Sequence, residues 1–294
     1  MINPIQYYEG MIIDRPCAVL GMPNNVYHAH KGSISNSGLV LVDRSPAHYQ
    51  SRGSWESTRA KEMGTAIHTA FLEPDVFAHD FVIVHGSHAR TDKAYRDAKE
   101  YSGAAFTFTE DEGEKILGTQ QSILTNKNAR LMIDEQHYTE ISIFANDPET
   151  GVLVRVRFDL LTESGRCVDL KKTRDARSDE FQKAIWNYKY YRQAAFYSDV
   201  FQWFTGEKPI SYEWWAIEEE APYALKIYEP DDFCLDAGRF EYRRALDTYA
   251  ECVNSGIWNP YPSEKELIGL PTWVAYKLED EMDKLPIKFP GDES

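Results

Sequence analysis

The clearest pattern in the chain is an alternation of apolar and polar residues near its middle. Apolar residues take every second position in 139–145 and again in 152–159, and an apolar-rich segment follows at 166–173. Turn-forming residues separate these segments at 147–151 and 163–165. Alternation with period two, interrupted by turns, predicts a three-stranded antiparallel meander.

Apolar residues at helical spacing predict helices on both sides of this meander. Serines that can cap a helix start, Ser35 or Ser37 and then Ser45 before Pro46, support two short helices within 35–50. Further helices are expected at 62–72, in the polar stretch 90–130 with breaks near Gly103 and Thr109, at 179–204 and at 231–254, with a strand pair at 210–217 and 223–229. Strands between helices predict an α/β fold, in which helices flank a mixed sheet.

The length and composition fit one large folded domain. The 294 residues are 43% hydrophobic, and no repeat or Pro/Gly/Ser-rich linker divides them. We therefore expect a single domain over 1–294. Its N-terminal helical part would cover about 18–135, its core about 136–230, and its C-terminal helix and tail 231–294.

The sequence carries no sign of a membrane or secretory destination. No apolar run approaches the roughly 18 residues of a membrane span, and the first ten residues lack a basic start followed by an apolar stretch. The four cysteines form no CxxC pair: Cys17, Cys167, Cys234 and Cys252. We expect a soluble cytoplasmic protein with reduced thiols.

The charge is distributed unevenly along the chain. The net charge of −15 disfavours a polyanionic partner, but 151–192 contains ten Lys/Arg and six Asp/Glu, whereas 211–294 contains eight and nineteen. The basic residues that could contact phosphates are Arg155, Arg157, Lys172, Arg174 and Arg177. An ordinary solvated surface explains the same pattern, so charge alone does not decide between the two explanations.

The second hairpin of the meander places charged residues opposite one another. A three-residue loop at 163–165 puts Asp159 directly opposite Asp169, with Cβ atoms about 4.5–5.5 Å apart. Lys171 projects to the same face as Asp169 and lies opposite Arg157. Opposed carboxylates are destabilising unless a positive charge compensates them, and a divalent cation does so well because it prefers hard oxygen ligands.

The first hairpin adds a third carboxylate to this face. If Ile141 pairs with Val156, Glu140 becomes a diagonal neighbour of Asp159. A salt-bridged polar sheet face without metal is the alternative interpretation. Carboxylates beside a lysine are also what metal-assisted phosphodiester hydrolysis requires, because the metal holds the phosphate and the lysine orients or deprotonates water.

These residues resemble a known signature. Asp159 followed by Asp169-Leu170-Lys171 is similar to the motif of PD-(D/E)XK nucleases, with Phe158 where a proline often stands. Three segments resemble the RecB-type branch: Gly64–His68, Val168–Thr173 and Gln193–Tyr197. The segments 27–30, 34–37, 45–49, 64–74, 147–151 and 196–199 resemble RecE-type exonuclease domains of prophages, and the resemblance runs from about 18 to 275.

The resemblance implies a restriction-endonuclease-like core and a specific site. Its implied metal ligands are His68, Asp159, Asp169 and the carbonyl of Leu170, with Glu140 as an outer or second-metal ligand. Lys171 would activate water, while Gln193 and Tyr197 would support the site or touch the DNA backbone. The cofactor would be Mg²⁺, with Mn²⁺ as a substitute. Ser45-Pro46 stands where iron–sulfur members have Cys-Pro, so no Fe–S cluster is expected, and the absence of a P-loop motif predicts no use of ATP.

The function expected from the resemblance is a two-metal-type exonuclease acting on the ends of linear double-stranded DNA in a bacterial or phage-infected cell. It would proceed 5′ to 3′ and leave 3′ tails for recombination by a phage-type, RecT-like annealing protein. A homo-oligomeric ring around DNA would keep an acidic chain processive. Two alternatives stay open at this point: another nuclease of the superfamily, endonucleolytic or single-strand-specific, and a non-catalytic DNA-binding recombination scaffold.

Overall fold

The computed structural model describes residues 2–53 and 58–284. The chain divides into two compact units, Met1–Pro260 and Tyr261–Ser294. The strands are β1 (Ile5–Gln6), β2 (Cys17–Leu20), β3 (Phe81–Val84), β4 (Phe106–Thr109), β5 (His137–Asn146), β6 (Leu153–Thr162), β7 (Arg166–Thr173), β8 (Ser211–Glu218) and β9 (Leu225–Tyr228). The helices are α1 (Asn24–Ala29), α2 (Asn36–Arg44), α3 (Pro46–Gln50), α4 (Arg59–Leu72), α5 (Pro74–Asp80), α6 (Lys93–Tyr101), α7 (Glu110–Thr125), α8 (Lys127–Ile133), α9 (Ser178–Asn187), α10 (Tyr190–Thr205), α11 (Asp232–Ser255) and α12 (Thr272–Met282).

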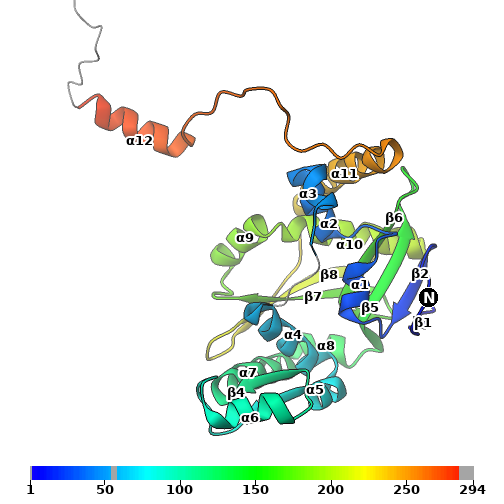
Figure 1. The fold of residues 1–294 in the computed structure, drawn as a ribbon, viewed down its shortest axis with the longest axis vertical. Helices are drawn as coiled ribbons and strands as arrows, with labels where there is room; N and C mark the ends of the chain where they lie inside the picture. Colours follow the sequence, from blue (N-terminus) through cyan, green and yellow to red (C-terminus); the bar gives the residue numbers. More distant parts are fainter. Residues whose placement is uncertain (1, 54–57, 285–294) are drawn as a thin grey trace, which may run out of the picture. The chain divides into compact units, whose positions relative to one another are not determined.

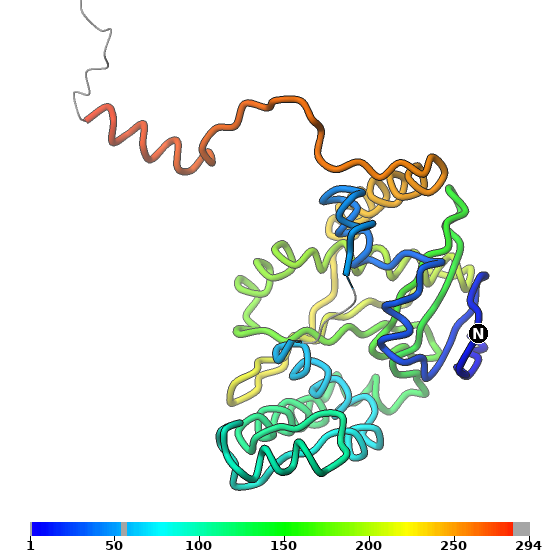
Figure 2. The backbone as a smooth tube through the Cα atoms, in the orientation of Figure 1, coloured from blue at the N-terminus to red at the C-terminus, as the bar shows by residue number. Residues whose placement is uncertain are grey.

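The larger unit is built on a seven-stranded mixed sheet. Its strand order is β1-β2-β5-β6-β7-β8-β9, with the predicted meander β5-β6-β7 at the centre. The pair β7-β8 is parallel, and the chain passes between these strands through α9 and α10 (Figure 2). The predicted α/β class with a mixed sheet flanked by helices is confirmed.

Helices cover both faces of this sheet (Figure 1). The consecutive residues Trp214 and Trp215 of β8 point to opposite faces and are both fully buried. One core lies against α2, α10 and α11, with Leu39, Phe158, Phe196 and Leu246 among its members. The other lies against α4 and α7, with Ile67, Ile116, Leu160 and Leu170. The central strands are therefore held in place from both sides.

The register of the second hairpin agrees with the prediction, and that of the first does not. Leu160 pairs with Val168 in β6-β7, as the three-residue loop requires. In β5-β6, however, Ile141 pairs with Phe158 rather than with Val156. The cause is a longer turn at 147–152, because the buried carboxylate of Asp147 accepts hydrogen bonds from Thr150 and organises extra residues there. Glu140 consequently falls opposite Asp159, not diagonal to it.

The breaks predicted near Gly103 and Thr109 are confirmed, but the segment between them contains a strand, and a second predicted helix is interrupted. The polar stretch 90–130 contains β4 as well as α6, α7 and most of α8, because the alternating sequence of β4 pairs with β3 in a separate two-stranded parallel sheet. The rings of Phe81 and Phe106 stack there with centroids 4.8 Å apart. A continuous helix over 179–204 is also wrong, since Lys189 adopts φ 59° and separates α9 from α10.

The smaller unit contains α12, whose described residues are exposed or half-buried. Within 2–53 and 58–284, no helix is both long and apolar enough to cross a membrane. The predicted extent of the nuclease domain, 1–294, stays a prediction.

Candidate active site

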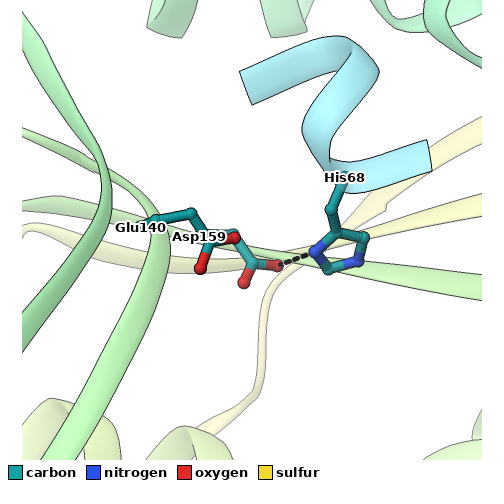
Figure 3. Close-up of side chains that lie close together, drawn as sticks. All are labelled: His68, Glu140 and Asp159. Carbon is teal, nitrogen blue, oxygen red and sulfur yellow. Dashed lines mark ion pairs between the residues drawn. The ribbon is translucent and has the colours of Figure 1, made fainter. Parts of the chain in front are cut away.

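Three side chains from three elements converge on one point beside the central strands. His68 comes from α4, Glu140 from β5 and Asp159 from β6 (Figure 3). One ligand atom of each lies within 4.8 Å of the others, and His68 Nδ1 is 3.6 Å from Asp159 Oδ2. The register of β5 and β6 brings the two carboxylates together, and α4 supplies the imidazole because Ile67 and Ala70 bury its other side.

The strands β6 and β7 separate at this point. Their ladder ends at Leu160 and Val168, and the backbone N–H of Leu170 then donates to Asp159 Oδ2 at 2.7 Å. The carboxylate of Asp159 thus replaces a backbone acceptor on the partner strand. The predicted pairing of Arg157 with Lys171 does not form, because the ladder has already ended.

A second group of side chains surrounds Asp169. This carboxylate is only 6% exposed, and Lys171 Nζ lies 2.9 Å from its Oδ1 and 2.7 Å from its Oδ2. Gln193 of α10 completes the group, since its Nε2 donates to Asp169 Oδ1 at 3.2 Å and its Oε1 accepts from Lys171 Nζ at 3.0 Å. Asp169 is not part of the three-residue cluster of His68, Glu140 and Asp159.

Burial and the charge of Asp159 raise the pKa of two acidic groups of the site. Burial raises the pKa of Glu140 to about 8, and the charge of Asp159 acts in the same direction, against Arg157. Burial also raises the pKa of Asp169, although the ammonium of Lys171 opposes this and Asp159 adds to it. Burial lowers the pKa of Lys171, but the charge of Asp169 outweighs it and the net direction is upward. A divalent cation would relieve this concentration of negative charge.

The backbone of Glu140 is strained. Its φ of 49° lies in the left-handed region, which costs a residue with a side chain about 1–3 kcal/mol. Its neighbours Thr139 and Ile141 both pair with β6, whereas Glu140 forms no ladder pair with Asp159. The surrounding sheet therefore holds Glu140 in a conformation that it would not adopt in a regular strand, at the position where its carboxylate joins the cluster.

Two aromatic side chains of α10 support the site. The ring of Tyr197 is half-buried and packs edge-on against Phe158, with centroids 5.3 Å apart. Lys171 Nζ lies 4.5 Å from the ring centre of Tyr190. We did not predict Tyr190 as a site residue. Its spacing of three from Gln193 on one helix was the signal that could have identified it.

The basic residues that were expected to contact phosphates do not form one continuous surface. Arg155 is buried at 5% exposure, and its Nη1 donates to the carbonyl and hydroxyl oxygens of Ser33, so its burial contradicts the prediction that it contacts phosphates. Arg157 donates to Ser142 Oγ, Asn24 Oδ1 and the Met22 carbonyl. Lys172 pairs with Glu219, and Arg177 with Asp175, while Arg174 is exposed. Tertiary packing, which composition does not reveal, separates these residues.

The donor set of the cluster fits a hard divalent cation. Two carboxylates and one imidazole are ligands that such cations accept, and the side chains of His68 and Asp159 are both partly exposed. The three ligand atoms are close enough to share one ion after small rotations of the side chains. Leu170 lies beside the cluster through its N–H bond to Asp159, and the role of its carbonyl as a further ligand stays a prediction.

Comparisons with known proteins agree with the fold. The profile of a family described as "PDDEXK-like domain of unknown function (DUF3799)" matches residues 35–268. A candidate exonuclease from Eubacterium rectale has a similar solved structure, with 14% identity, a TM-score of 0.57 and coverage of 87% of this chain and 97% of that one. A phage-related exonuclease from Haemophilus somnus 129PT is 12% identical over 76% of this chain and 96% of its own, with a TM-score of 0.33. The sequence has no match among curated proteins.

Proposed function

Because the chain belongs to the PDDEXK-like family DUF3799, we propose that it is a divalent-metal-dependent nuclease that digests linear double-stranded DNA from its ends. The observation that carries the proposal is the placement of Lys171 and Asp169 beside the cluster of His68, Glu140 and Asp159. A sheet face stabilised only by salt bridges has no need of a carboxylate whose pKa is raised to about 8, nor of strain at Glu140.

In the proposed mechanism, His68, Glu140 and Asp159 hold the metal. A metal bound by these residues would supply Lewis-acid polarisation of the scissile phosphate and a lowered pKa for a bound water molecule. Lys171 orients the attacking water and stabilises the negative charge that develops on the phosphate. Gln193 and Asp169 fix the ammonium of Lys171 through bonds of 3.0 Å and 2.7–2.9 Å, so that its position requires no reorganisation during the reaction.

We further propose that the metal is Mg²⁺, with Mn²⁺ as a substitute, and that no ATP is consumed. The carboxylate ligands support Mg²⁺, and the resemblance to RecE-type domains supports digestion from 5′ to 3′, 3′ tails for strand annealing by a RecT-like partner, and a homo-oligomeric ring. Native mass spectrometry would detect the ring as one discrete multiple of the 33.9 kDa chain.

The test uses three substrates with Mg²⁺: linear duplex labelled at the 5′ end, the same duplex labelled at the 3′ end, and a covalently closed circle. We expect early release of short products from the 5′ label, late release from the 3′ label, and an intact circle. Cutting of the circle would show an endonuclease instead. Binding of all three without cleavage would show a scaffold and contradict the proposal.

A further inference from the structure

A second concave site lies away from the metal ligands. It is a cavity of about 790 Å³ formed by α1, α3, the end of α11 and the residues that follow α11. Its lining includes His28, Lys31, Tyr49, Arg52, Tyr249 and Trp258. No Asp or Glu lines it among the residues that the structure describes, although the whole chain carries a net charge of −15. Such a cavity favours an anionic ligand.

Its aromatic side chains form a stacked group. Tyr49 and Trp258 lie nearly parallel, with an interplanar angle of 19° and centroids 5.6 Å apart. Tyr249 meets both rings near their edges, at 5.2 and 5.8 Å. The guanidinium of Arg52 lies over the ring of Tyr49 at 3.7 Å. Trp258 is only half-buried, so this group offers an aromatic face and a cation to a ligand.

A buried cation lies behind the cavity. Arg155 is in no ion pair within the described chain, and its Nε has no hydrogen-bond partner there. A buried charge without a counter-ion is costly, because the protein interior solvates it poorly. Burial lowers the pKa of Arg155, and Arg52 lowers it further against the effect of Tyr27 and Tyr49. An anion in the cavity would supply the missing negative charge.

The lowered pKa of His28, which also lines the cavity, indicates the same positive potential. Desolvation lowers the pKa of His28 to about 4, and the charges of Arg157, Arg155 and Lys61 act in the same direction. The adjacent residue Tyr27 lies under the guanidinium of Arg157, 4.3 Å from it. In helix α1, Tyr27 therefore contacts β6, the strand that carries Asp159, and the next residue, His28, lines the cavity.

We propose that this cavity binds one unpaired nucleotide of a DNA strand, with its base against Trp258 and its phosphate beside Arg52 and Lys31. An aromatic face next to cations is the combination that single strands bind, because every base can stack and every phosphate is an anion. The inference rests on the proposed function and extends it. It implies that the enzyme separates the strands near the metal site and retains one of them here.

The test measures fluorescence anisotropy of labelled (dT)12 in EDTA, so that no cleavage occurs. Lys31 and Arg52 are both exposed, and for the double substitution K31Q/R52Q we expect a loss of affinity of about tenfold. Because two phosphate contacts are lost, the slope of log K against log salt should become smaller by about 1.4. The matched control K93Q/R96Q removes one exposed Lys and one exposed Arg from α6 and should leave both values unchanged. Trp258→Leu should cost at least about fivefold on (dT)12 and nothing on an abasic oligomer.

Equal affinities of wild type and K31Q/R52Q would overturn the inference, as would displacement of (dT)12 by equimolar dTMP, which would indicate a site for free nucleotides. The proposed function is judged separately, from digestion of linear duplex in Mg²⁺. A protein that digests duplex but shows no effect of K31Q/R52Q refutes only the nucleotide cavity. A protein that leaves duplex intact but loses oligomer binding in K31Q/R52Q refutes only the proposed nuclease activity.

Discussion

The carboxylate of Asp159 has two roles in the structure. Its Oδ2 accepts the N–H of Leu170 at 2.7 Å and also lies 3.6 Å from His68 Nδ1. The first contact fixes where β6 and β7 separate, and the second places the carboxylate in the cluster. A substitution of Asp159 therefore affects both strand geometry and metal binding, whereas a substitution of Glu140 affects chiefly metal binding.

We predict that Glu140→Gln weakens binding of Mn²⁺ at least about tenfold without unfolding the protein. The amide keeps the shape of the side chain but removes the negative charge that a divalent cation needs. Isothermal titration calorimetry measures the affinity, and thermal unfolding without metal should show an unchanged or higher Tm, because Asp159 no longer faces a second carboxylate. The control is Glu163→Gln, which changes a carboxylate in the turn after β6. Equal Mn²⁺ affinity of wild type and Glu140→Gln would contradict the assignment of Glu140 as a ligand.

The helices α4 and α7 are joined by an ion pair that should be sensitive to acid. Arg59 Nε donates to Glu112 Oε1 at 3.0 Å, and Glu112 also accepts the N–H of Thr109 in the capping box of α7. Burial raises the pKa of Glu112, but its bonds to Arg59, Thr109 and Arg90 outweigh burial and lower the pKa to about 2. This pair holds in place the helix that carries His68.

Glu112→Gln should lower the free energy of unfolding by about 2–3 kcal/mol at neutral pH. The pKa of Glu112 is lower in the folded protein than its value of about 4.5 in the unfolded chain. Its carboxylate therefore stabilises the folded state above about pH 4.5, and this stabilisation is lost as the pH falls toward 2. The difference between wild type and variant should therefore shrink between about pH 5 and pH 2 in urea unfolding. Glu114→Gln, exposed on the same helix, is the control. A difference that is constant with pH would contradict this account.

The contact between α10 and α11 depends on a glycine. A Cβ added at Gly238 would lie 2.4 Å from the carbonyl oxygen of Tyr191 and 2.7 Å from Ala195 Cβ. Gly238→Ala must push the helices apart, and we expect a loss of about 1–3 kcal/mol, or about 3–10 °C in Tm. Gly269→Ala meets nothing within 4 Å and should leave the Tm unchanged. Calorimetry that shows equal Tm values for both variants would refute this close packing.

The elements near the site could be predicted from the sequence to different extents. The three-residue loop 163–165 fixed the pairing of Leu160 with Val168, but not the separation of β6 and β7 beyond this pair, where Asp159 and Lys171 lie. The loop after β5 can adopt several conformations. The one in the structure depends on the buried Asp147, which is bonded to Arg243, and sequence patterns near the loop do not reveal this contact. The strain at Glu140 and the burial of Arg155 also depend on tertiary contacts. The short strands β1 to β4 went unpredicted because two to four residues carry little periodicity.

At the scale of the whole molecule, the proposed function requires an acidic chain to bind DNA, which is itself acidic. Net charge repels DNA, so binding has to come from local positive potential. The structure places positive potential around His28, Arg52 and Arg155, within the same compact unit as the cluster of His68, Glu140 and Asp159. We therefore expect DNA binding to weaken strongly with salt.

The most direct test of the account is the digestion of linear duplex DNA by wild type and by Lys171→Ala, each with Mg²⁺ and with EDTA. The account predicts short products from wild type with Mg²⁺ only, and a loss of at least about a hundredfold in rate for Lys171→Ala. Lys183→Ala, an exposed lysine of α9, should digest at the wild-type rate. Digestion in EDTA, or an undiminished rate for Lys171→Ala, would contradict the metal-dependent site described here.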